Sequence, residues 1–355
     1  MQNRQMKDKL LTLIIPTYNM EKYLDKCLTS LIIKDDDLFK LLEVLVIIDG
    51  ATDQSSSIAH SYQARFPEVF ATIDKENGNY GSCINKGLHL ATGKYVKVLD
   101  ADDSFSTVHL EQYLIWLNNV DADMVISPYE IVDETGIVQS LEVYDLPINT
   151  MLTWQQLAPA FMKKALQMHA VTYKLQNLLD IRYTQTEGIS YTDQEWIFTP
   201  LIAVNTAVAY PDAIYKYLVG RAGQTVCADV FKRNISHNEQ CARRIVQDYK
   251  SFGRFEAYKQ DYLDYKFTAT ITAMYFWYLL RYPDLDISEL VRFDDFVKSV
   301  DESYIDLLDT QLIKHTHFHY IKHWHRNRWN RNNISRLYYI YSRILGHCCN
   351  ICRKN

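Results

Sequence analysis

Two aspartates, Asp100 and Asp102, stand one residue apart in the sequence LDADD, directly after an apolar run at 94–99. Carboxylates with this spacing at the end of a strand can share a hard divalent cation, Mg²⁺ or Mn²⁺, which keeps open positions for diphosphate oxygens. The alternative is an acidic loop that is solvated at the surface or that caps a helix beginning near Thr107. Because Asp-x-Asp pairs are common, it is the preceding strand that favours a metal site.

A third carboxylate, Asp49, ends another apolar run at 43–48 and is followed by Gly50. At a buried strand end it can accept a hydrogen bond from the N–H of a nucleotide base, and the glycine lets the backbone turn sharply or approach a ligand. The alternative is a helix-capping motif, which Asp53 ahead of three serines also fits. Asp49 by itself leaves both possibilities open.

The segment ENGNYGSCINKG, at 76–87, is a glycine-rich loop that leads into a helical pattern. Its backbone N–H groups can approach phosphates at a helix start, and Lys86 can add a positive charge. The glycines lack the G-x-G-x-x-G spacing of dinucleotide-binding folds, and the segment lacks the Gly-Lys-Ser/Thr of a P-loop. A turn selected for its backbone geometry is the alternative.

Apolar runs alternate with helical patterns over the first hundred residues. This alternation predicts strands at 10–15, 43–48, 69–73 and 94–99, a helix from about Glu21 capped by Asn19, and helices at 58–66 and 84–88. Strands separated by helices imply right-handed crossovers and a largely parallel sheet, with ligands beyond the carboxyl ends of its strands. A strand at 124–127, a helix at 153–166, strands near 170–174 and 213–219 and long helices beyond Arg221 complete the prediction.

Three motifs in order, PTYN (16–19), IDGATD (48–53) and the stretch from ENGNYG to LDADD (76–103), resemble family 2 glycosyltransferases, which are inverting enzymes of the GT-A fold. The resemblance implies an α/β fold, in which a GT-A catalytic domain with a Rossmann-like, mostly parallel sheet is followed by a helical C-terminal region. Its expected divisions are a nucleotide-sugar-binding half at 1–105, an acceptor-binding half at 106–225 and a helical region with a basic, aromatic tail at 226–355.

The same resemblance assigns roles to individual residues. Asp49 reads the base, usually uracil, and Asp100 and Asp102 hold the divalent cation, Mn²⁺ or Mg²⁺, with Asp102 the more direct ligand. The donor-binding residues that it implies are Pro16, Tyr18, Asn19, Asp49, Asn85, Lys86, Asp100, Ala101, Arg221 and Gln224.

Two residues depart from the family's usual pattern. Ile48 replaces an aspartate that is frequent in the family and Ala51 replaces a usual serine, which bears on base and ribose recognition. The segment 215–226 resembles a loop that some of these enzymes place near the donor diphosphate, and Arg221 and Gln224 are assigned on that ground. A structural turn is the alternative for this loop.

Downstream, GISYTDQEWIF (188–198) resembles the family's acidic motif, with Asp193 and Trp196 in place and Thr192 where glutamate is usual. A carboxylate at a helix start can take the proton of an acceptor hydroxyl. Asp193 is therefore the predicted catalytic base, and Glu195 is the reserve. The alternative is that these carboxylates only complement the helix dipole.

The net charge is −5, but it is distributed unevenly along the chain. No acidic residue follows Asp309, whereas nine lysines and arginines do, interleaved with tryptophans and tyrosines over 314–355. With apolar positions at helical spacing around 334–345, this tail is predicted to lie on an anionic membrane surface. Packing on the protein's own acidic body and nucleic-acid binding are the alternatives, and no nucleic-acid partner is expected. The histidines at 315–325 form no clear tetrahedral metal set and are expected at the surface.

Seven cysteines with scattered spacing, and no secretory signal, predict reduced thiols in a cytosol. The cysteines of HCCNIC near the C-terminus lack a recognisable fourth zinc ligand, so an ordinary tail is favoured over a metal site. No apolar stretch is long enough to span a membrane. The predicted location is the cytoplasm, peripheral at the inner face of the cell membrane.

Together these features predict an inverting, metal-dependent glycosyltransferase that moves a sugar from a nucleotide diphosphate sugar, a UDP-sugar by resemblance, to an acceptor hydroxyl. The expected acceptor is a saccharide or lipid-linked saccharide of a surface polysaccharide, such as a capsule or exopolysaccharide. One alternative is a non-catalytic nucleotide- or glycan-binding relative. The other is a sugar nucleotidyltransferase, which should show a Gly-rich, arginine-containing loop after its first strand where this chain has PTYN.

Overall fold

The computed structural model describes residues 9–221, 224, 228–282, 284–313 and 318–327. The chain divides into two compact units. The first comprises Met1–Phe231 and Phe255–Tyr262 and contains both β-sheets. The second comprises Lys232–Arg254 and Leu263–Asn355 and is helical where it is described. All of the predicted site residues belong to the first unit.

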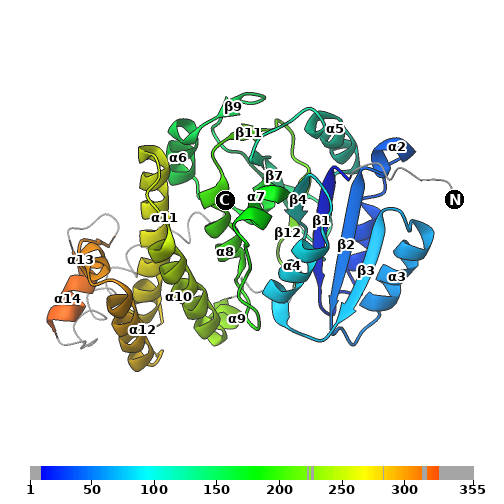
Figure 1. Ribbon diagram of the computed structural model, residues 1–355. Coiled ribbons are helices and arrows are strands. Elements are labelled where there is room, and N and C mark those ends of the chain that lie inside the picture. The colour runs from blue at the N-terminus through cyan, green and yellow to red at the C-terminus, as the bar shows by residue number, and fades with distance from the viewer. Residues whose placement is uncertain (1–8, 222–223, 225–227, 283, 314–317, 328–355) are drawn as a thin grey trace. The chain divides into compact units, whose positions relative to one another are not determined.

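The larger sheet of the first unit has eight strands. In spatial order they are β3 (Phe70–Lys75), β2 (Leu42–Asp49), β1 (Leu11–Thr17), β4 (Tyr95–Val98), β10 (Val171–Lys174), β6 (Met124–Ile126), β11 (Ala207–Ala209) and β9 (Met151–Leu152). The first four run parallel, and Figure 1 shows β1, β2 and β3 side by side. Because β1 and β2 are buried on both faces, their sequences are nearly continuous apolar runs, and the four predicted strands are confirmed.

The direction of the sheet changes at β10, which runs antiparallel to both β4 and β6. The sequence predicts a strand here but not its direction, because a short apolar run looks the same in either orientation. The pairing brings the residues that precede β10 next to the carboxyl end of β4. The sheet is therefore mixed, and its parallel half carries the predicted motifs.

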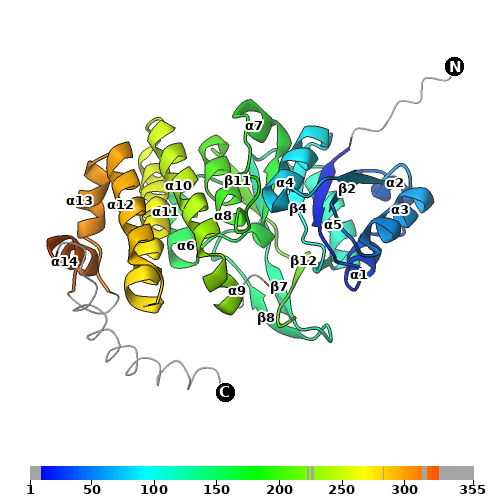
Figure 2. The ribbon, with the colours of Figure 1, turned by 90° about the horizontal axis from the view of Figure 1, so that it is seen from below.

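A second sheet has four strands in the order β5 (Ser104–Phe105), β12 (Tyr215–Leu218), β7 (Tyr129–Val132) and β8 (Val138–Glu142). β7 and β8 form an antiparallel hairpin, and β7 pairs with β12 (Figure 2). Because β5 follows the LDADD sequence directly and pairs with β12, this sheet brings residues near 215 to the acidic motif.

Helices of the first unit position the loops at the strand ends. They are α1 (Leu24–Thr29), α2 (Asp36–Phe39), α3 (Ser55–Arg65), α4 (Asn79–Leu90), α5 (Thr107–Leu117), α6 (Trp154–Lys163), α7 (Leu175–Asp180) and α8 (Asp193–Trp196), with 3₁₀ turns at Met168–Ala170 and Thr199–Ala203. α4 packs so closely on β1 that a Cβ added at Gly87 would lie 2.5 Å from Cγ2 of Ile14. Glycine is needed there, because any side chain would prevent this close packing of α4 on β1.

The first helix begins later than predicted. α1 starts at Leu24, while Asn19, the predicted cap, has a backbone φ of 53° and accepts a hydrogen bond from the N–H of Thr52 at 2.8 Å. Asparagine adopts this left-handed conformation more readily than most residues. The prediction of an Asn19 cap is therefore wrong: this side chain joins the turn after β1 to the turn after β2.

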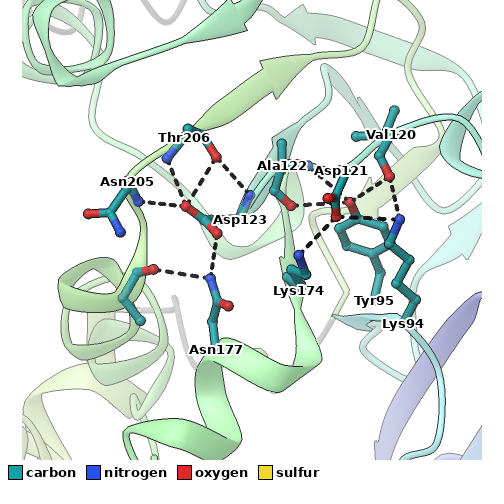
Figure 3. A network of polar contacts seen from close by, with 11 residues as sticks. Lys94, Tyr95, Val120, Asp121, Ala122, Asp123, Lys174, Asn177, Asn205 and Thr206 are labelled. Carbon is teal, nitrogen blue, oxygen red and sulfur yellow. Dashed lines mark hydrogen bonds and ion pairs between the residues drawn. The ribbon is translucent and has the colours of Figure 1, made fainter.

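Asp123 joins three segments at the end of the larger sheet opposite the predicted site (Figure 3). Its Oδ2 accepts hydrogen bonds from the backbone N–H groups of Asn205 and Thr206, at 2.8 and 2.9 Å, and its Oδ1 accepts one from Nδ2 of Asn177 at 2.8 Å. Partial burial raises the pKa of Asp123, but these hydrogen bonds outweigh that effect and hold it below the usual value. The carboxylate is thus a structural anchor.

Replacing Asp123 with alanine is expected to destabilise the first unit by about 2–4 kcal/mol, because several donors lose a charged acceptor. Since folding lowers the pKa of Asp123, its contribution is complete above the pKa of the unfolded chain and is lost as the pH falls through the folded-state pKa. Urea unfolding at neutral pH measures the loss. The control is Asp121→Ala, which removes a surface carboxylate that is 73% exposed and pairs with Lys174. Equal losses in the two variants would contradict the prediction.

The second unit is built from helices, as the sequence predicts for the region beyond Arg221. They are α10 (Ile235–Ser251), most of α11 (Ala257–Phe276) with a π-helical turn at Trp277–Arg281, α12 (Ile287–Val300), α13 (Ser303–Asp309) and α14 (Tyr320–Arg326), while α9 (Ala228–Arg233) crosses the boundary between the units. Among the described residues, no helix combines the length and the apolar character that crossing a membrane requires.

α14 belongs to the tail that the sequence places at a membrane surface. Trp324 is fully buried, and His325 bridges Asp294 and Asp309 with nitrogen–oxygen distances of 2.9 and 2.6 Å. The expectation that these two residues lie at the surface is wrong, because this part of the tail packs within the second unit. Residues 314–317 and 328–355, which include the pattern at 334–345 and the last three cysteines, lie outside the described residues.

Candidate functional site

A cleft of about 520 Å³ lies beyond the carboxyl ends of β1, β2 and β4. This is where a parallel sheet is expected to bind its ligand. Seven predicted site residues line it: Pro16, Tyr18, Asp49, Asp100, Ala101, Asp102 and Arg221. Met20, Tyr80 and Ser190, to which the sequence gave no role, line it as well.

Asp49 is buried at the end of β2 with one carboxylate oxygen anchored. Its Oδ1 accepts hydrogen bonds from Nζ of Lys75 at 2.5 Å and from the N–H of Gly78 at 2.9 Å. Nδ2 of Asn77 also donates to its backbone carbonyl, at 2.9 Å. The thiol of Cys83 also lies within hydrogen-bond reach of this carboxylate, and Asp49 lines the cleft. The sequence indicated Asp49 but not Lys75, which fixes its orientation.

Asp100 is held by a tyrosine that the motifs do not single out. The hydroxyl of Tyr80 donates a hydrogen bond to its Oδ1 at 2.8 Å. Burial raises the pKa of Asp100 to about 7, and the charges of Asp102 and Asp193 add to this effect, while the bond from Tyr80 opposes it. The negative charges of several carboxylates therefore repel one another in this region, and a bound cation would relieve that repulsion.

Asp102 pairs with Arg221, which comes from the loop after β12. Nε of Arg221 donates to Oδ2 of Asp102, and the guanidinium lies 5.5 Å from the ring centroid of Tyr23. The loop resemblance thus indicated a residue that reaches the Asp-x-Asp pair. In the structure Arg221 pairs with Asp102, which is the predicted direct metal ligand.

Asp103 completes the acidic cluster, by which we mean Asp100, Asp102 and Asp103. It is buried and accepts hydrogen bonds from the hydroxyl of Tyr215 at 2.6 Å and from the N–H of Leu218 at 2.7 Å. These bonds tie the LDADD sequence to β12. The sequence left Asp103 without a role because nothing in its spacing indicates the partner strand.

The structure also brings a histidine to the acidic cluster. Asp100, Asp103 and His169 offer ligand atoms that all lie within 4.8 Å of one another, and Asp102 is not part of this group. Burial and the charge of Lys97 lower the pKa of His169 to about 3, so its imidazole is neutral near pH 7. Carboxylate oxygens and a neutral imidazole nitrogen are suitable ligands for a divalent cation. Of the two predicted cations, this donor set fits Mn²⁺ better than Mg²⁺.

Asp193 opens α8 and lies close to the acidic cluster. Burial raises the pKa values of Asp100 and Tyr217, and the charge of Asp193 contributes to both shifts. Thr192, which stands where the family has glutamate, is buried and donates a hydrogen bond to Oε1 of Gln185 at 2.9 Å. Glu195 accepts a bond from a backbone N–H at 2.8 Å and is 1% exposed. The assignment of Asp193 as the catalytic base, with Glu195 as the alternative, stays a prediction.

Four predicted donor residues are absent from the lining of the cleft: Asn19, Asn85, Lys86 and Gln224. Asn85 exchanges hydrogen bonds with the backbone of Gln185, and Lys86 is exposed on α4. Gln224 ties its own turn, donating to the carbonyl of Leu218 and accepting from the N–H of Gly220. In the structure these side chains shape the loops around the cleft, and their contact with a donor stays a prediction.

Comparisons with known proteins agree with this geometry. A family model described as glycosyl transferase family 2 matches residues 12–159. An uncharacterized glycosyltransferase of Mycoplasma pneumoniae is 41% identical over 98 residues, which are 27% of this chain and 32% of that protein. The poly(ribitol-phosphate) beta-N-acetylglucosaminyltransferase TarS of Staphylococcus aureus is 26% identical over 213 residues, 60% of this chain and 36% of that protein. The chain thus spans about a third of the length of these curated relatives.

The solved structure of S. aureus TarS residues 1–349 with UDP-GlcNAc is similar to this chain with a TM-score of 0.64. The match covers 90% of this chain and 88% of that one at 20% identity, and a likeness at this identity shows the fold. Asp49, Asp100 and Asp102 lie inside the segment that the family model matches, whereas Asp193 and Arg221 lie beyond it. Residues 12–159 are therefore similar to glycosyl transferase family 2, and the fold of the chain is GT-A.

Proposed function

We propose that the protein is an inverting glycosyltransferase that transfers a sugar from a UDP-sugar to an acceptor hydroxyl. The observation that carries the proposal is the meeting of Asp49, Asp100 and Asp102 in one cleft, with Asp193 near enough for its charge to act on Asp100. Such a reaction needs a group that recognises the nucleobase and a cation site for the diphosphate. It also needs a general base that takes the proton of the incoming hydroxyl. We assign all three roles to residues of the first unit.

The nucleoside is assigned to the ends of β1 and β2. Asp49 offers Oδ2 to the N3–H of uracil, because Lys75 and Gly78 hold its Oδ1. Tyr18 lines the cleft and is 50% exposed, so its ring is free to cover the nucleoside. The TarS structures with UDP-GlcNAc and with UDP support a uridine donor, and UDP-GlcNAc is the first donor to test.

The proposed reaction is a single displacement at the anomeric carbon. Asp193 accepts the proton of the acceptor hydroxyl as that oxygen attacks and the diphosphate leaves. Asp100 and Asp102 would hold a divalent cation, which would supply positive charge where the departing diphosphate becomes more negative. Arg221, which pairs with Asp102 in the structure, can turn its guanidinium to the same phosphates.

The finer assignments are proposals of the same kind. The donor is assigned to 1–105 and the acceptor, a saccharide or lipid-linked saccharide of a surface polysaccharide, to 106–225. The basic and aromatic residues of 328–355 are proposed to attach the protein to an anionic membrane surface on its cytoplasmic side. The absence of acidic residues after Asp309 supports this last assignment.

Nucleoside diphosphate release tests the proposed function. UDP-GlcNAc and other UDP-sugars are incubated with acceptor saccharides, with Mn²⁺ or with EDTA in its place. We expect UDP to be released only when the cation is present. Release of pyrophosphate from UTP and a sugar 1-phosphate would identify a nucleotidyltransferase, and binding of UDP-sugars without turnover would identify a non-catalytic relative.

A further inference from the structure

His169 reaches the acidic cluster because of the way β10 pairs with β4. The antiparallel register joins Tyr173 to Val96 and Lys174 to Tyr95. Continued by four residues along both chains, it places His169 opposite Asp100. The side chains confirm this placement, since their ligand atoms lie within 4.8 Å of one another.

Both the backbone and the ring of His169 are held in place. Nζ of the fully buried Lys97 donates hydrogen bonds to the carbonyls of His169 and Val171, at 2.7 and 3.0 Å. The imidazole stacks on the ring of Tyr217 with centroids 4.2 Å apart and meets the ring of Tyr215 edge-on at 4.9 Å. Packing on the ring faces therefore fixes the direction in which the two nitrogens point.

One of these nitrogens has no partner within the described ranges of the chain. His169 is 9% exposed, and its Nδ1 is buried without a hydrogen bond. Burying an unsatisfied nitrogen costs about 1–3 kcal/mol, which a histidine that only fills space would avoid by pairing. The ring also lies beside two carboxylates, because ligand atoms of Asp100, Asp103 and His169 all lie within 4.8 Å of one another. A cation bound between the histidine and the carboxylates would give the unpaired nitrogen a partner. It would also balance the negative charge of the carboxylates.

We infer that His169 is a nitrogen ligand of the divalent cation, acting together with Asp100 and Asp103. The inference rests on the proposed function and adds two ligands to the pair predicted from the sequence. Asp103 can take part although Tyr215 and Leu218 already donate to it, because each carboxylate oxygen keeps a second lone pair. A nitrogen ligand favours Mn²⁺ or Co²⁺ over Mg²⁺, which prefers oxygen ligands alone.

Electron spin echo envelope modulation of Mn²⁺ tests this inference on the full chain with UDP present, because a coordinated nitrogen couples to the electron spin. We expect ¹⁴N coupling in the wild-type protein, and ¹⁵N coupling after the histidines are labelled with ¹⁵N. His169→Asn and His169→Gln keep a polar side chain, and both are expected to lose the coupling and to bind Mn²⁺ about tenfold or more weakly. His60→Gln is the matched control, since His60 pairs with Asp74 at the surface, and is expected to keep both properties.

Three results would count against the inference, and they can be told apart. Mn²⁺ bound without nitrogen coupling in the wild-type protein would overturn it and leave the proposed function standing. Coupling that survives in both His169 variants would assign the nitrogen to another histidine and would also overturn it. If no Mn²⁺ binds in the presence of UDP, the metal dependence of the proposed function fails together with the inference. The labelled wild-type protein decides the question even if a variant does not fold.

Discussion

Replacement of Asp102 by asparagine is expected to lower the rate of sugar transfer about a thousandfold while the fold survives. Asp102 lines the cleft beside Asp100 and pairs with Arg221 in the structure. Asparagine keeps the shape of the side chain but removes the charge that attracts a cation. UDP release at saturating donor measures kcat, and thermal unfolding reports on the fold, because Arg221 loses its ionic partner in this variant.

The matched control for this prediction is Asp121→Asn. Its carboxylate is 73% exposed and pairs with Lys174 away from the cleft, so kcat should stay at the wild-type value. If Asp102→Asn keeps wild-type activity with Mn²⁺, the role of Asp102 as the direct ligand is refuted. The cation would then be left to Asp100 with the two ligands inferred from the structure.

Asp193→Asn is expected to lower kcat by about a hundred- to ten-thousandfold, because a general base contributes a factor of this size. The side chain lies close to the acidic cluster, where it contributes to the raised pKa of Asp100, but it is not among the residues that line the donor cleft. The affinity for UDP with Mn²⁺ should therefore change little. Single-turnover transfer and calorimetric titration with UDP measure the two effects separately.

The variant Glu195→Gln distinguishes between the two candidates for the catalytic base, Asp193 and Glu195. Glu195 is 1% exposed and accepts a hydrogen bond from the N–H of Thr186 at 2.8 Å, so its loss should lower stability more than turnover. If activity is lost in Glu195→Gln and kept in Asp193→Asn, the catalytic base is Glu195 and not Asp193. A large fall in UDP affinity in Asp193→Asn would show that this carboxylate belongs to the donor site.

The positions of Asp49, Asp100 and Asp102 could be predicted from the sequence because each ends or closely follows a strand that is buried on both faces. Burial on both faces leaves an apolar run that is easy to recognise, and parallel strands bring their carboxyl ends to one edge. The order of the motifs along the chain was therefore enough to place these three carboxylates in one cleft. The structure confirms that placement.

The partners of these carboxylates could not be predicted, because they depend on pairings between distant segments. Lys75 reaches Asp49 through the register of β2 with β3, and Arg221 reaches Asp102 from the loop after β12. His169 stands opposite Asp100 only because β10 is antiparallel to β4. A strand of four residues carries no signal for its direction, so no motif could have indicated this histidine.

Two of the failures have a common physical cause. Asn19 was placed at a helix start because asparagine caps helices well, yet the same side chain also stabilises left-handed turns, and here it bonds to Thr52. The tryptophans of the basic tail are predicted to lie on a membrane surface because lysines and arginines surround them, yet Trp324 is fully buried in the second unit. In both cases the residue type permits two environments, and tertiary contacts select between them.

The central claim is that the strand ends hold a uridine nucleotide and a cation side by side. A crystal structure of the protein with UDP and Mn²⁺, with anomalous scattering to locate the metal, tests this most directly. The account predicts uracil within hydrogen-bond distance of Asp49 and a manganese peak between the diphosphate and Asp100. Uracil bound elsewhere, or a diphosphate in the cleft with no manganese beside the acidic cluster, would contradict it.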